Sequence, residues 1–310
     1  MLDHSELLVI GECVADIVRL PDEADRVHPG GSPANVAYGL ARLGHRAVLL
    51  TQLGPDENGR LIREHLVSGG VDVRTDGSTA PTPSAAVTLD GAGQAGYAFD
   101  VSWTLAPVAV GPAPVHVHTG SIGAVVEPGS ATVLDLVRAA RATATVSYDP
   151  NVRPGLMGDH AAAVRRVEEY VALSDLVKAS DEDLEWLYPG EEPEQVAARW
   201  LGRGPAVVLV TRGGDGALAV LPGGRVTVAA PAVEVADTVG AGDAFMSGTL
   251  HALAGHGLLG PDARERLRAV DRDTVVGVLR HAVASAAVTV SRAGANPPGP
   301  DELRKALTRN

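Results

Sequence analysis

Cysteine, lysine and aromatic residues are scarce in this chain of 310 residues. Its single cysteine, Cys13, excludes an intrachain disulfide and a cysteine-based metal site, and it is typical of a reducing compartment. Only two of the 26 basic residues are lysines, Lys178 and Lys305, which we ascribe to a codon bias toward G and C. No G-x-x-x-x-G-K-[ST] sequence is present, so any use of ATP proceeds without a Walker loop.

Long apolar runs and excess positive charge are also lacking. No uninterrupted apolar run approaches the ~18 residues of a membrane span, and the N-terminal segment MLDHSELLVIGE carries acids where a signal peptide carries positive charge. We therefore expect a cytoplasmic protein that does not cross a membrane. The net charge of −12 argues against a nucleic-acid partner, because such binding rests on clustered cations.

The apolar residues that are present form an α/β pattern. Short β-rich runs alternate with longer segments rich in Ala, Leu and Arg, which is typical of a parallel sheet covered by helices. Strands are predicted at residues 7–10, 48–53, 115–118, 145–148, 176–177 and 207–211. Helices are predicted at 33–43, 59–68, 131–140, 160–173, 194–201, 244–253 and 275–290. We expect one large domain over residues 1–310.

Two segments, 12–29 and 84–104, break this rhythm with β-type patterns and glycine turns, and we predict that they form a small separate sheet. The second contains Gly91-x-Gly93-x-x-Gly96, nominally a dinucleotide-binding fingerprint. That fingerprint requires a following helix, whereas residues 97–103 have the pattern of a strand. A hairpin turn is therefore favoured over a nucleotide loop.

The segment 237–243 (DTVGAGD) is the strongest local signal for chemistry. Gly240, Ala241 and Gly242 precede the predicted helix 244–253 and would present backbone N–H groups at its N-terminus, a geometry that binds phosphate without cations. Asp243 would repel a phosphate there, which makes sense if it accepts the proton of an attacking hydroxyl. The alternative is an ordinary acid in the first turn of a helix.

A second helix, with clear start and stop signals, is predicted near the N-terminus. Ser32 is expected as its N-cap, Pro33 as its first residue, and Gly44 follows its end. Asn35 falls in the first turn, where its amide could donate to and accept from sugar hydroxyls. A merely exposed Asn35 remains the alternative.

Two further candidates leave alternatives open. His116 and His118 have the spacing of metal ligands on a strand, but without a His or Cys cluster nearby they are better explained as ordinary strand residues. Arg153, in the segment Asp149-Pro-Asn-Val-Arg153, either meets a phosphate or pairs with Asp149.

Together, segments 30–44 and 237–243 resemble the two signatures of the ribokinase-like (PfkB) carbohydrate kinases, and the similarity extends in order over 11–16, 53–56, 149–153, 210–216 and 291–297. The resemblance implies a three-layer α/β/α domain with a mostly parallel central sheet. It also implies that segments 12–29 and 84–104 form a small β-sheet lid, through which relatives often pair as homodimers. A phosphotransferase acting on an alcohol group follows, with ATP and Mg²⁺ as cofactors and K⁺ beside the anion hole.

The same resemblance assigns roles to residues. The catalytic residues implied are Asp243 as general base and Gly240, Ala241 and Gly242 as anion hole. The acceptor-binding residues implied are Asp16, Gly31, Asn35 and Asp243. The ATP-binding residues implied are Lys178, Thr211, Gly213, Gly216, Thr238, Gly240 and Gly242. Ser180 and Asp183 stand where the family has an Asn-x-x-Glu element associated with magnesium and phosphate, and we place Arg153 with them. Asp237 would be the side-chain ligand of K⁺.

The substrate is expected to be a neutral sugar. Segments 149–153 and 11–16 look most like the fructokinase and 2-keto-3-deoxygluconate kinase branch. A sugar-acid carboxylate needs a cation in the lid, but residues 80–103 contain no arginine and Asp100 would repel it. Fructose is the first choice; 2-keto-3-deoxygluconate, ribose, inositol and nucleosides are alternatives. Outside the kinases, a sugar-binding sensor or a nucleotide-cofactor oxidoreductase would be the competing classes.

Overall fold

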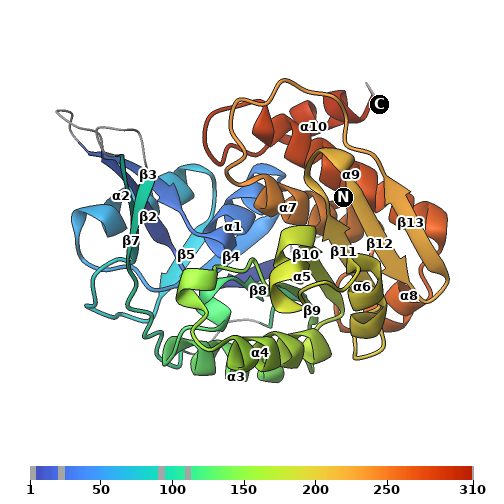
Figure 1. The fold of residues 1–310 in the computed structure, drawn as a ribbon, viewed down its shortest axis with the longest axis horizontal. Coiled ribbons are helices and arrows are strands. Elements are labelled where there is room, and N and C mark those ends of the chain that lie inside the picture. Colours follow the sequence, from blue (N-terminus) through green and yellow to red (C-terminus); the bar gives the residue numbers. More distant parts are fainter. Residues whose placement is uncertain (1–4, 20–24, 90–94, 109–112, 309–310) are drawn as a thin grey trace.

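The computed structural model describes residues 5–19, 25–89, 95–108 and 113–308. In these ranges a large sheet is covered by helices on both faces, and a smaller sheet lies at one side (Figure 1). The α/β fold predicted from the sequence is confirmed.

The large sheet has the strand order β13-β12-β11-β10-β9-β8-β1-β4-β5. Its strands are β1 (Glu6–Ile10), β4 (Arg46–Thr51), β5 (Asp72–Thr75), β8 (His116–Gly120), β9 (Thr145–Asp149), β10 (Leu176–Ser180), β11 (Val207–Thr211), β12 (Ala217–Leu221) and β13 (Gly224–Val228). All neighbours from β5 to β11 are parallel, and β12 and β13 extend the sheet in antiparallel fashion. After β1 the chain adds β4 and β5 on one side of it and then β8, β9, β10 and β11 on the other side. The strand order therefore reverses at β1. Ligands of such sheets bind outside the carboxyl ends of the strands at this reversal.

Helices form two layers around this sheet. They are α1 (Ser32–Arg42), α2 (Glu57–Ser68), α3 (Gly129–Ala140), α4 (His160–Leu173), α5 (Asp181–Leu187), α6 (Pro193–Leu201), α7 (Ala241–Gly255), α8 (Arg264–Arg268), α9 (Arg272–Val290) and α10 (Pro300–Leu307). One apolar core lies between the sheet and α1, α2, α7 and α9, and a second lies between the sheet and α3 to α6. The three-layer arrangement expected from the sequence is therefore present.

The smaller sheet has the order β3-β2-β6-β7, from β2 (Val14–Arg19), β3 (Arg26–Gly30), β6 (Ser84–Leu89) and β7 (Ala95–Asp100). It confirms that segments 12–29 and 84–104 form a separate sheet. β6 and β7 pair in antiparallel fashion, and Gly96 lies within β7. Gly91 and Gly93 fall outside the described residues. A strand at Gly96 is incompatible with the helix that a dinucleotide-binding fingerprint requires.

The start of α1 differs from the prediction. Gly31, with φ 101°, occupies the N-cap position, so Ser32 is the first helical residue and Pro33 the second. The predicted N-cap role of Ser32 is wrong, because its hydroxyl makes no capping hydrogen bond. A left-handed φ is accessible to glycine at little cost, which explains why the cap position falls on Gly31.

Of the described helices, α9 is the one whose length and composition would allow it to cross a membrane, with a mean hydropathy of 1.2. The expectation from uninterrupted runs did not identify it, because Arg280 and His281 interrupt the apolar sequence. Half of the window is buried, and Leu279 and Ala282 belong to the core shared with α7. We therefore interpret α9 as a core helix.

Candidate active site

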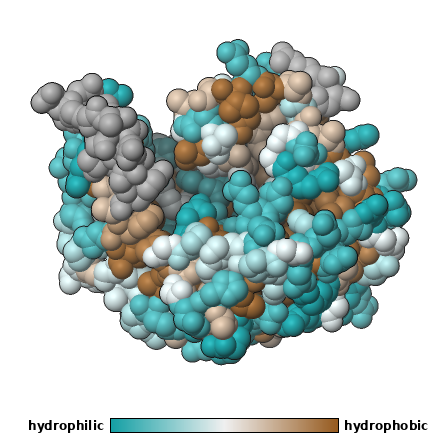
Figure 2. Space-filling view, in the orientation of Figure 1, coloured by the Kyte–Doolittle hydropathy of each residue, from teal (hydrophilic) through white to brown (hydrophobic). Residues whose placement is uncertain are grey.

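The predicted site residues gather where the carboxyl ends of β1, β8, β9 and β10 meet the N-termini of α1 and α7. The space-filling view shows a notch between the small sheet and the rest of the molecule, with hydrophilic residues inside it (Figure 2). The location agrees with the position expected for ligands of an open α/β sheet.

Asp243 lies in the first turn of α7 and is held by two side chains of α1. Ser32 Oγ donates to Asp243 Oδ1 at 2.6 Å, and Asn35 Nδ2 donates to Asp243 Oδ2 at 2.8 Å. Burial raises the pKa of Asp243, while these two hydrogen bonds and the charges of Lys178 and Arg153 oppose that rise. The carboxylate is therefore fixed in orientation by neutral donors, and it is not directly ion-paired.

Ser32 is a site residue that sequence reasoning missed. Its spacing of three residues from Asn35 places both side chains on one face of α1. That spacing was the available signal, but a serine before a proline at the start of a helix is more often a cap.

The glycine-rich segment at the start of α7 fits the geometry of an anion hole. Gly240 is the N-cap with φ 74°, and a Cβ placed on it would lie 2.6 Å from the Cβ of Ala295. The Ala241 N–H donates to the carbonyl of Thr238 at 3.2 Å, which closes the turn. The amides of Gly242 and Asp243 follow at positions that have no acceptor within a helix. These two amides are thus the best-placed backbone donors for an anion.

Lys178 brings a positive charge to the same turn. A Cβ placed on Gly242 would lie 2.9 Å from Lys178 Nζ, and this ammonium donates to Asp149 Oδ2 at 2.7 Å. Both side chains are buried, with exposed fractions of 4% and 1%. Burial favours a lower pKa for Lys178, but the carboxylates of Asp149, Asp183 and Asp243 outweigh it and raise that pKa. Lys178 is therefore a charged group directed at the α7 N-terminus.

The ion pair between Lys178 and Asp149 excludes one of the two contacts predicted for Arg153. The idea that Arg153 pairs with Asp149 is wrong, because the Asp149 carboxylate is taken by Lys178. Arg153 Nη1 donates instead to the carbonyls of Val152 at 2.9 Å and Asn151 at 3.4 Å. Its side chain is exposed beside the site, so a phosphate contact stays a prediction.

Ser180 and Asp183 form a capping box at the start of α5. Ser180 Oγ accepts from the Asp183 N–H at 2.9 Å, and the Asp183 oxygens accept from the N–H groups of Ser180 at 2.8 Å and Val152 at 2.7 Å. No cluster of three His, Cys, Asp or Glu suited to a metal occurs within the described part of the chain. Because both Asp183 oxygens already accept backbone N–H groups, a magnesium ion beside them would be held mainly by substrate phosphates and water, the mode that Mg²⁺ commonly adopts.

The predicted nucleotide residues line the adjoining part of this edge. Thr211 ends β11 and is paired in register with Ser180 on β10. Gly213 and Gly216 have φ values of 49° and 88°, and a Cβ on Gly216 would lie 2.1 Å from the carbonyl of Val228. The close approach explains the glycine at position 216.

Asp237 joins two loops beside α7. Its Oδ1 accepts from the Val239 N–H at 3.0 Å and its Oδ2 from the Gly294 N–H at 2.8 Å. These backbone hydrogen bonds lower the pKa of Asp237. An ionised carboxylate with free lone pairs is suited to K⁺, although both oxygens already serve the loops.

The part of the site predicted to bind the acceptor is formed by the small sheet and the link to α1. Asp16 on β2 has its pKa raised to about 6, chiefly by burial and also by Asp243, while His28 and Arg153 act in the opposite direction. A Cβ on Gly31 would lie 2.6 Å from the Glu12 carbonyl, so only glycine fits there. Phe99, 45% exposed, lies in the same cross-strand row as Asp16. The carboxyl group of Asp16 and the exposed ring of Phe99 thus lie in one row of the small sheet.

His116 and His118 are strand residues, as favoured from the sequence. Ser147 Oγ lies 2.8 Å from both His116 Nε2 and His118 Nδ1, and His116 Nδ1 lies 2.9 Å from Thr145 Oγ1. Burial lowers the pKa of each imidazole to about 3, so both are neutral at ordinary pH. They form a hydrogen-bonded ladder between β8 and β9.

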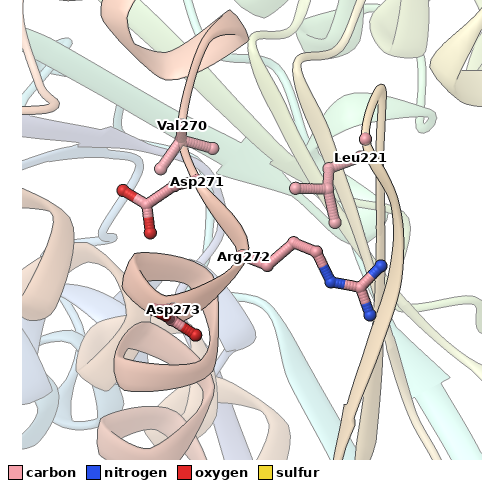
Figure 3. A pocket seen from close by; sticks show the side chains of 6 residues that line it. Leu221, Val270, Asp271, Arg272 and Asp273 are labelled. Atoms are coloured by element: carbon pink, nitrogen blue, oxygen red, sulfur yellow. The ribbon is translucent and has the colours of Figure 1, made fainter.

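A pocket of about 470 Å³ lies at the far end of the large sheet (Figure 3). It is lined by Leu221, Gly223, Val270, Asp271, Arg272 and Asp273, and it contains none of the predicted site residues. Asp271 caps α9 by accepting from the Thr274 N–H at 2.8 Å. We therefore assign this pocket no part in the chemistry.

Comparison with known proteins gives one consistent result. The profile described as pfkB family carbohydrate kinase matches residues 4–302. The fructokinase of Klebsiella pneumoniae is 34% identical over 98% of this chain and 100% of its own length. The fructokinase of Rhizobium leguminosarum bv. trifolii is 34% identical over 82% of this chain and 81% of its own.

Solved structures agree. The fructokinase of Xylella fastidiosa with bound ATP has a TM-score of 0.85 at 26% identity, over 99% of both chains. The fructokinase of Vibrio cholerae in its fructose, ADP and calcium ion bound form has a TM-score of 0.78 at 26% identity, covering 99% of this chain and 98% of its own. The aminoimidazole riboside kinase of Salmonella enterica, complexed with aminoimidazole riboside and an ATP analogue, has a TM-score of 0.79 at 26% identity, covering 97% of this chain and 99% of its own.

Proposed function

The chain belongs to the pfkB family of carbohydrate kinases and is thus a sugar phosphotransferase, and we propose that it transfers the γ-phosphoryl group of ATP to a primary hydroxyl of fructose. The single observation that carries this proposal is the placement of Asp243 between Ser32, Asn35 and the Gly242 turn. A base and an anion site adjoin each other there, as phosphoryl transfer to an alcohol requires.

Asp243 is proposed to take the proton of the attacking hydroxyl. Its raised pKa makes it a stronger base than an exposed aspartate, while the hydrogen bonds from Ser32 and Asn35 favour its ionised form. Each donor occupies one side of one oxygen, which leaves the remaining lone pairs for the acceptor hydroxyl.

The charge of the transferred group is proposed to meet the amides of Gly242 and Asp243 and the ammonium of Lys178. Donors already in place at a helix N-terminus need no reorganisation during the reaction. Magnesium bound with ATP would supply further neutralisation of the phosphate oxygens, next to Asp183 and Ser180. Local groups thus replace the clustered cations that the acidic chain lacks.

The acceptor is proposed to lie between Asp16 on the small sheet and Asn35 on α1. The small sheet would act as a lid, because water left beside the γ-phosphoryl group competes with the sugar as acceptor. We further propose K⁺ near Asp237 and pairing of two chains through their small sheets.

Fructose is preferred to an anionic sugar for a reason of charge. Residues 80–103 contain neither arginine nor lysine, and Asp100 ends β7 with a negative charge. The fructokinase relatives agree with a neutral sugar. The similarity to a riboside kinase keeps nucleosides as the alternative acceptors to be tested.

The decisive experiment measures ADP release from ATP and Mg²⁺ with fructose, ribose, 2-keto-3-deoxygluconate, inositol and adenosine, in K⁺ and in Na⁺ buffers. We expect the highest kcat/KM with fructose. A higher value with another acceptor would replace fructose but keep the kinase mechanism. Absence of ADP release with every acceptor would remove the proposed sugar kinase activity.

A further inference from the structure

Glu12 is a buried carboxylate that the proposed transfer step does not use. It follows β1 at the strand-order reversal, and 2% of its surface is exposed. Its backbone carbonyl packs against Gly31, the residue that links the small sheet to α1. Buried acids of this kind are retained only where their hydrogen bonds compensate for lost hydration.

The side chain of Glu12 holds the turn that follows β8. The Gly123 N–H donates to Glu12 Oε2 at 2.8 Å, and the Ser121 hydroxyl forms a second hydrogen bond to the carboxylate. A Cβ on Gly123 would lie 2.8 Å from the same oxygen, so the carboxylate occupies the space that any larger residue would need. Residues 121–123, which we call the β8 turn, are therefore fitted to Glu12.

The β8 turn is held in an unfavourable backbone conformation. Ser121 has φ 57°, and Asn151, after β9, has φ 37°. Asn151 Nδ2 donates to Ser121 Oγ at 3.1 Å, so two non-glycine residues in the left-handed region are bound to each other. Such conformations persist only where surrounding contacts enforce them, and they concentrate at functional sites.

The same turn anchors the small sheet. Trp103 lies three residues after β7, is 1% exposed, and donates from Nε1 to the Gly123 carbonyl at 3.0 Å. The Trp103 carbonyl accepts from the Gly129 N–H at 3.0 Å. Gly123 is thus held through its N–H by Glu12 and through its carbonyl by the segment that returns from the small sheet.

We propose that Glu12 is a positioning residue, which fixes the β8 turn and through Trp103 the seating of the small sheet over the acceptor. It acts on acceptor binding and not on the transfer step. This inference rests on the proposed function where acceptor turnover is its readout.

The ionised form of Glu12 is the one that satisfies the turn. Ser121 Oγ accepts from Asn151, so its proton is available to the carboxylate, which also accepts from the Gly123 N–H. A protonated Glu12 would have to donate to Ser121 and would leave the serine proton without this acceptor. Burial raises the pKa of Glu12 to about 7, although Ser121, Gly123 and the charge of Arg153 oppose the rise.

Other titrating groups lie close by. Cys13 is adjacent, and its pKa is raised to about 12 by burial, so it stays protonated throughout the range of interest. Asp16 and Asp243 lie close by and are present both in the unaltered protein and in Glu12→Gln. A comparison of the Glu12→Gln variant with the unaltered protein therefore isolates the contribution of Glu12.

The test measures kcat and the KM for fructose between pH 5.5 and 8.5. For the unaltered protein we expect KM to rise as the pH falls through about 7. We expect kcat to have a different pH dependence, because Glu12 takes no part in the transfer step. Glu12→Gln should raise KM about tenfold at pH 8, as expected for loss of one charge-assisted hydrogen bond. It should also remove the change of KM near pH 7.

The matched control is Glu6→Gln, at the opposite end of β1. Glu6 is 5% exposed and pairs with Arg74 at 3.1 Å, so it is a similarly buried acid at the start of the strand that Glu12 follows. We expect it to lower stability and to leave both KM and its pH dependence unchanged. A Glu12→Gln variant that behaves like Glu6→Gln would overturn the proposal.

A readout without turnover separates this proposal from the proposed function. Hydrogen exchange of the β8 turn and of residues 101–104, corrected for intrinsic rates, should increase in Glu12→Gln and in Trp103→Phe but not in Glu6→Gln. Unchanged exchange in both variants would overturn the positioning role even if fructose is a substrate. Increased exchange in a protein that does not phosphorylate fructose would retain the anchor and reject the proposed substrate.

Discussion

The two ends of the α1 and α7 pair are joined in different ways. At their N-termini, Ser32 and Asn35 donate to the carboxylate of Asp243 at 2.6 and 2.8 Å. At the far end, His45 Nε2 lies 2.9 Å from His251 Nδ1. The helices therefore run in the same direction, with an ionisable acceptor at one end and two imidazoles at the other.

The difference shows that the two ends of one helix pair can have different tasks: one end holds an ionisable carboxylate, and the other end attaches the helices to each other. The N-termini present unsatisfied N–H groups and partial positive charge, which stabilise an ionised Asp243. Burial lowers the pKa of His45 to about 4, and His251 adds to that effect, so the far contact is between neutral rings near neutral pH. Under the proposed mechanism the near end exchanges a proton during the reaction, whereas the far end only joins the helices.

The largest effect is expected from Asp243→Asn, which removes the base but keeps a group of the same shape. We expect kcat to fall by about 10²–10⁴, the usual contribution of a general base. Sugar binding, measured by calorimetry, should persist. Turnover within threefold of the unaltered protein would show that the proton is taken elsewhere.

A smaller loss is expected from Ser32→Ala, which removes one of the two donors to Asp243. Because the Ser32 hydrogen bond lowers the pKa of Asp243, its loss should move the acidic limb of the kcat profile to higher pH. We expect kcat at pH 7 to fall by about tenfold, as for one charge-assisted hydrogen bond. Ser291→Ala, after α9, is the matched control. An acidic limb that does not move would detach Ser32 from the base.

The middle of the helix pair provides a test of packing. A Cβ on Gly39 of α1 would lie 2.4 Å from Ser247 Oγ of α7. Gly39→Ala should lower the free energy of unfolding by about 1–2 kcal/mol, since overpacking costs more than the ~1 kcal/mol gained in helix propensity. Gly277→Ala in α9 has nothing within 4 Å and should raise stability. Equal effects in urea titrations would contradict the close contact.

The smallest effect on activity is expected at the far end. His45→Asn should lower the free energy of unfolding by about 1 kcal/mol at pH 7 and leave kcat unchanged. A lowered histidine pKa contributes stability that is present above its unfolded value of 6.5 and is lost as the pH falls through about 4. The variant should therefore lose stability less steeply between pH 6.5 and 4, with His251 as the remaining titrating ring of this contact. A change in kcat would mean that the two ends are coupled.

Much of the fold follows from local pattern. The helix α4 and the strand β11 begin and end where the sequence predicts, because each is bounded by a clear change of pattern. By contrast, β5, β12, β13, α5, α8 and α10 were not predicted. They are short, and some of them are fixed by neighbours that are distant in sequence, as β4 fixes β5.

The candidate site was predictable to the extent that glycines and sequence spacing reveal it. The turn at 240–242 was predicted from its glycines, and the resemblance implied that Asp243 and Asn35 serve one site; a hydrogen bond joins these two side chains. The partners were not predicted. The pair between Lys178 and Asp149 joins neighbouring strands, and the hydrogen bond between Ser32 and Asp243 joins residues 211 positions apart. Neither contact produces a periodic pattern in the sequence from which it could be predicted.

Gly31 has a mechanical consequence. The strand β3 ends at Gly30 and α1 begins at Ser32, so one residue connects the small sheet to the helix that orients Asp243. With φ 101° and no room for a side chain, that residue allows little adjustment between the sheet and the helix. A rotation of the small sheet would therefore be transmitted directly to the start of α1, and with it to the side chains of Ser32 and Asn35 that hold Asp243.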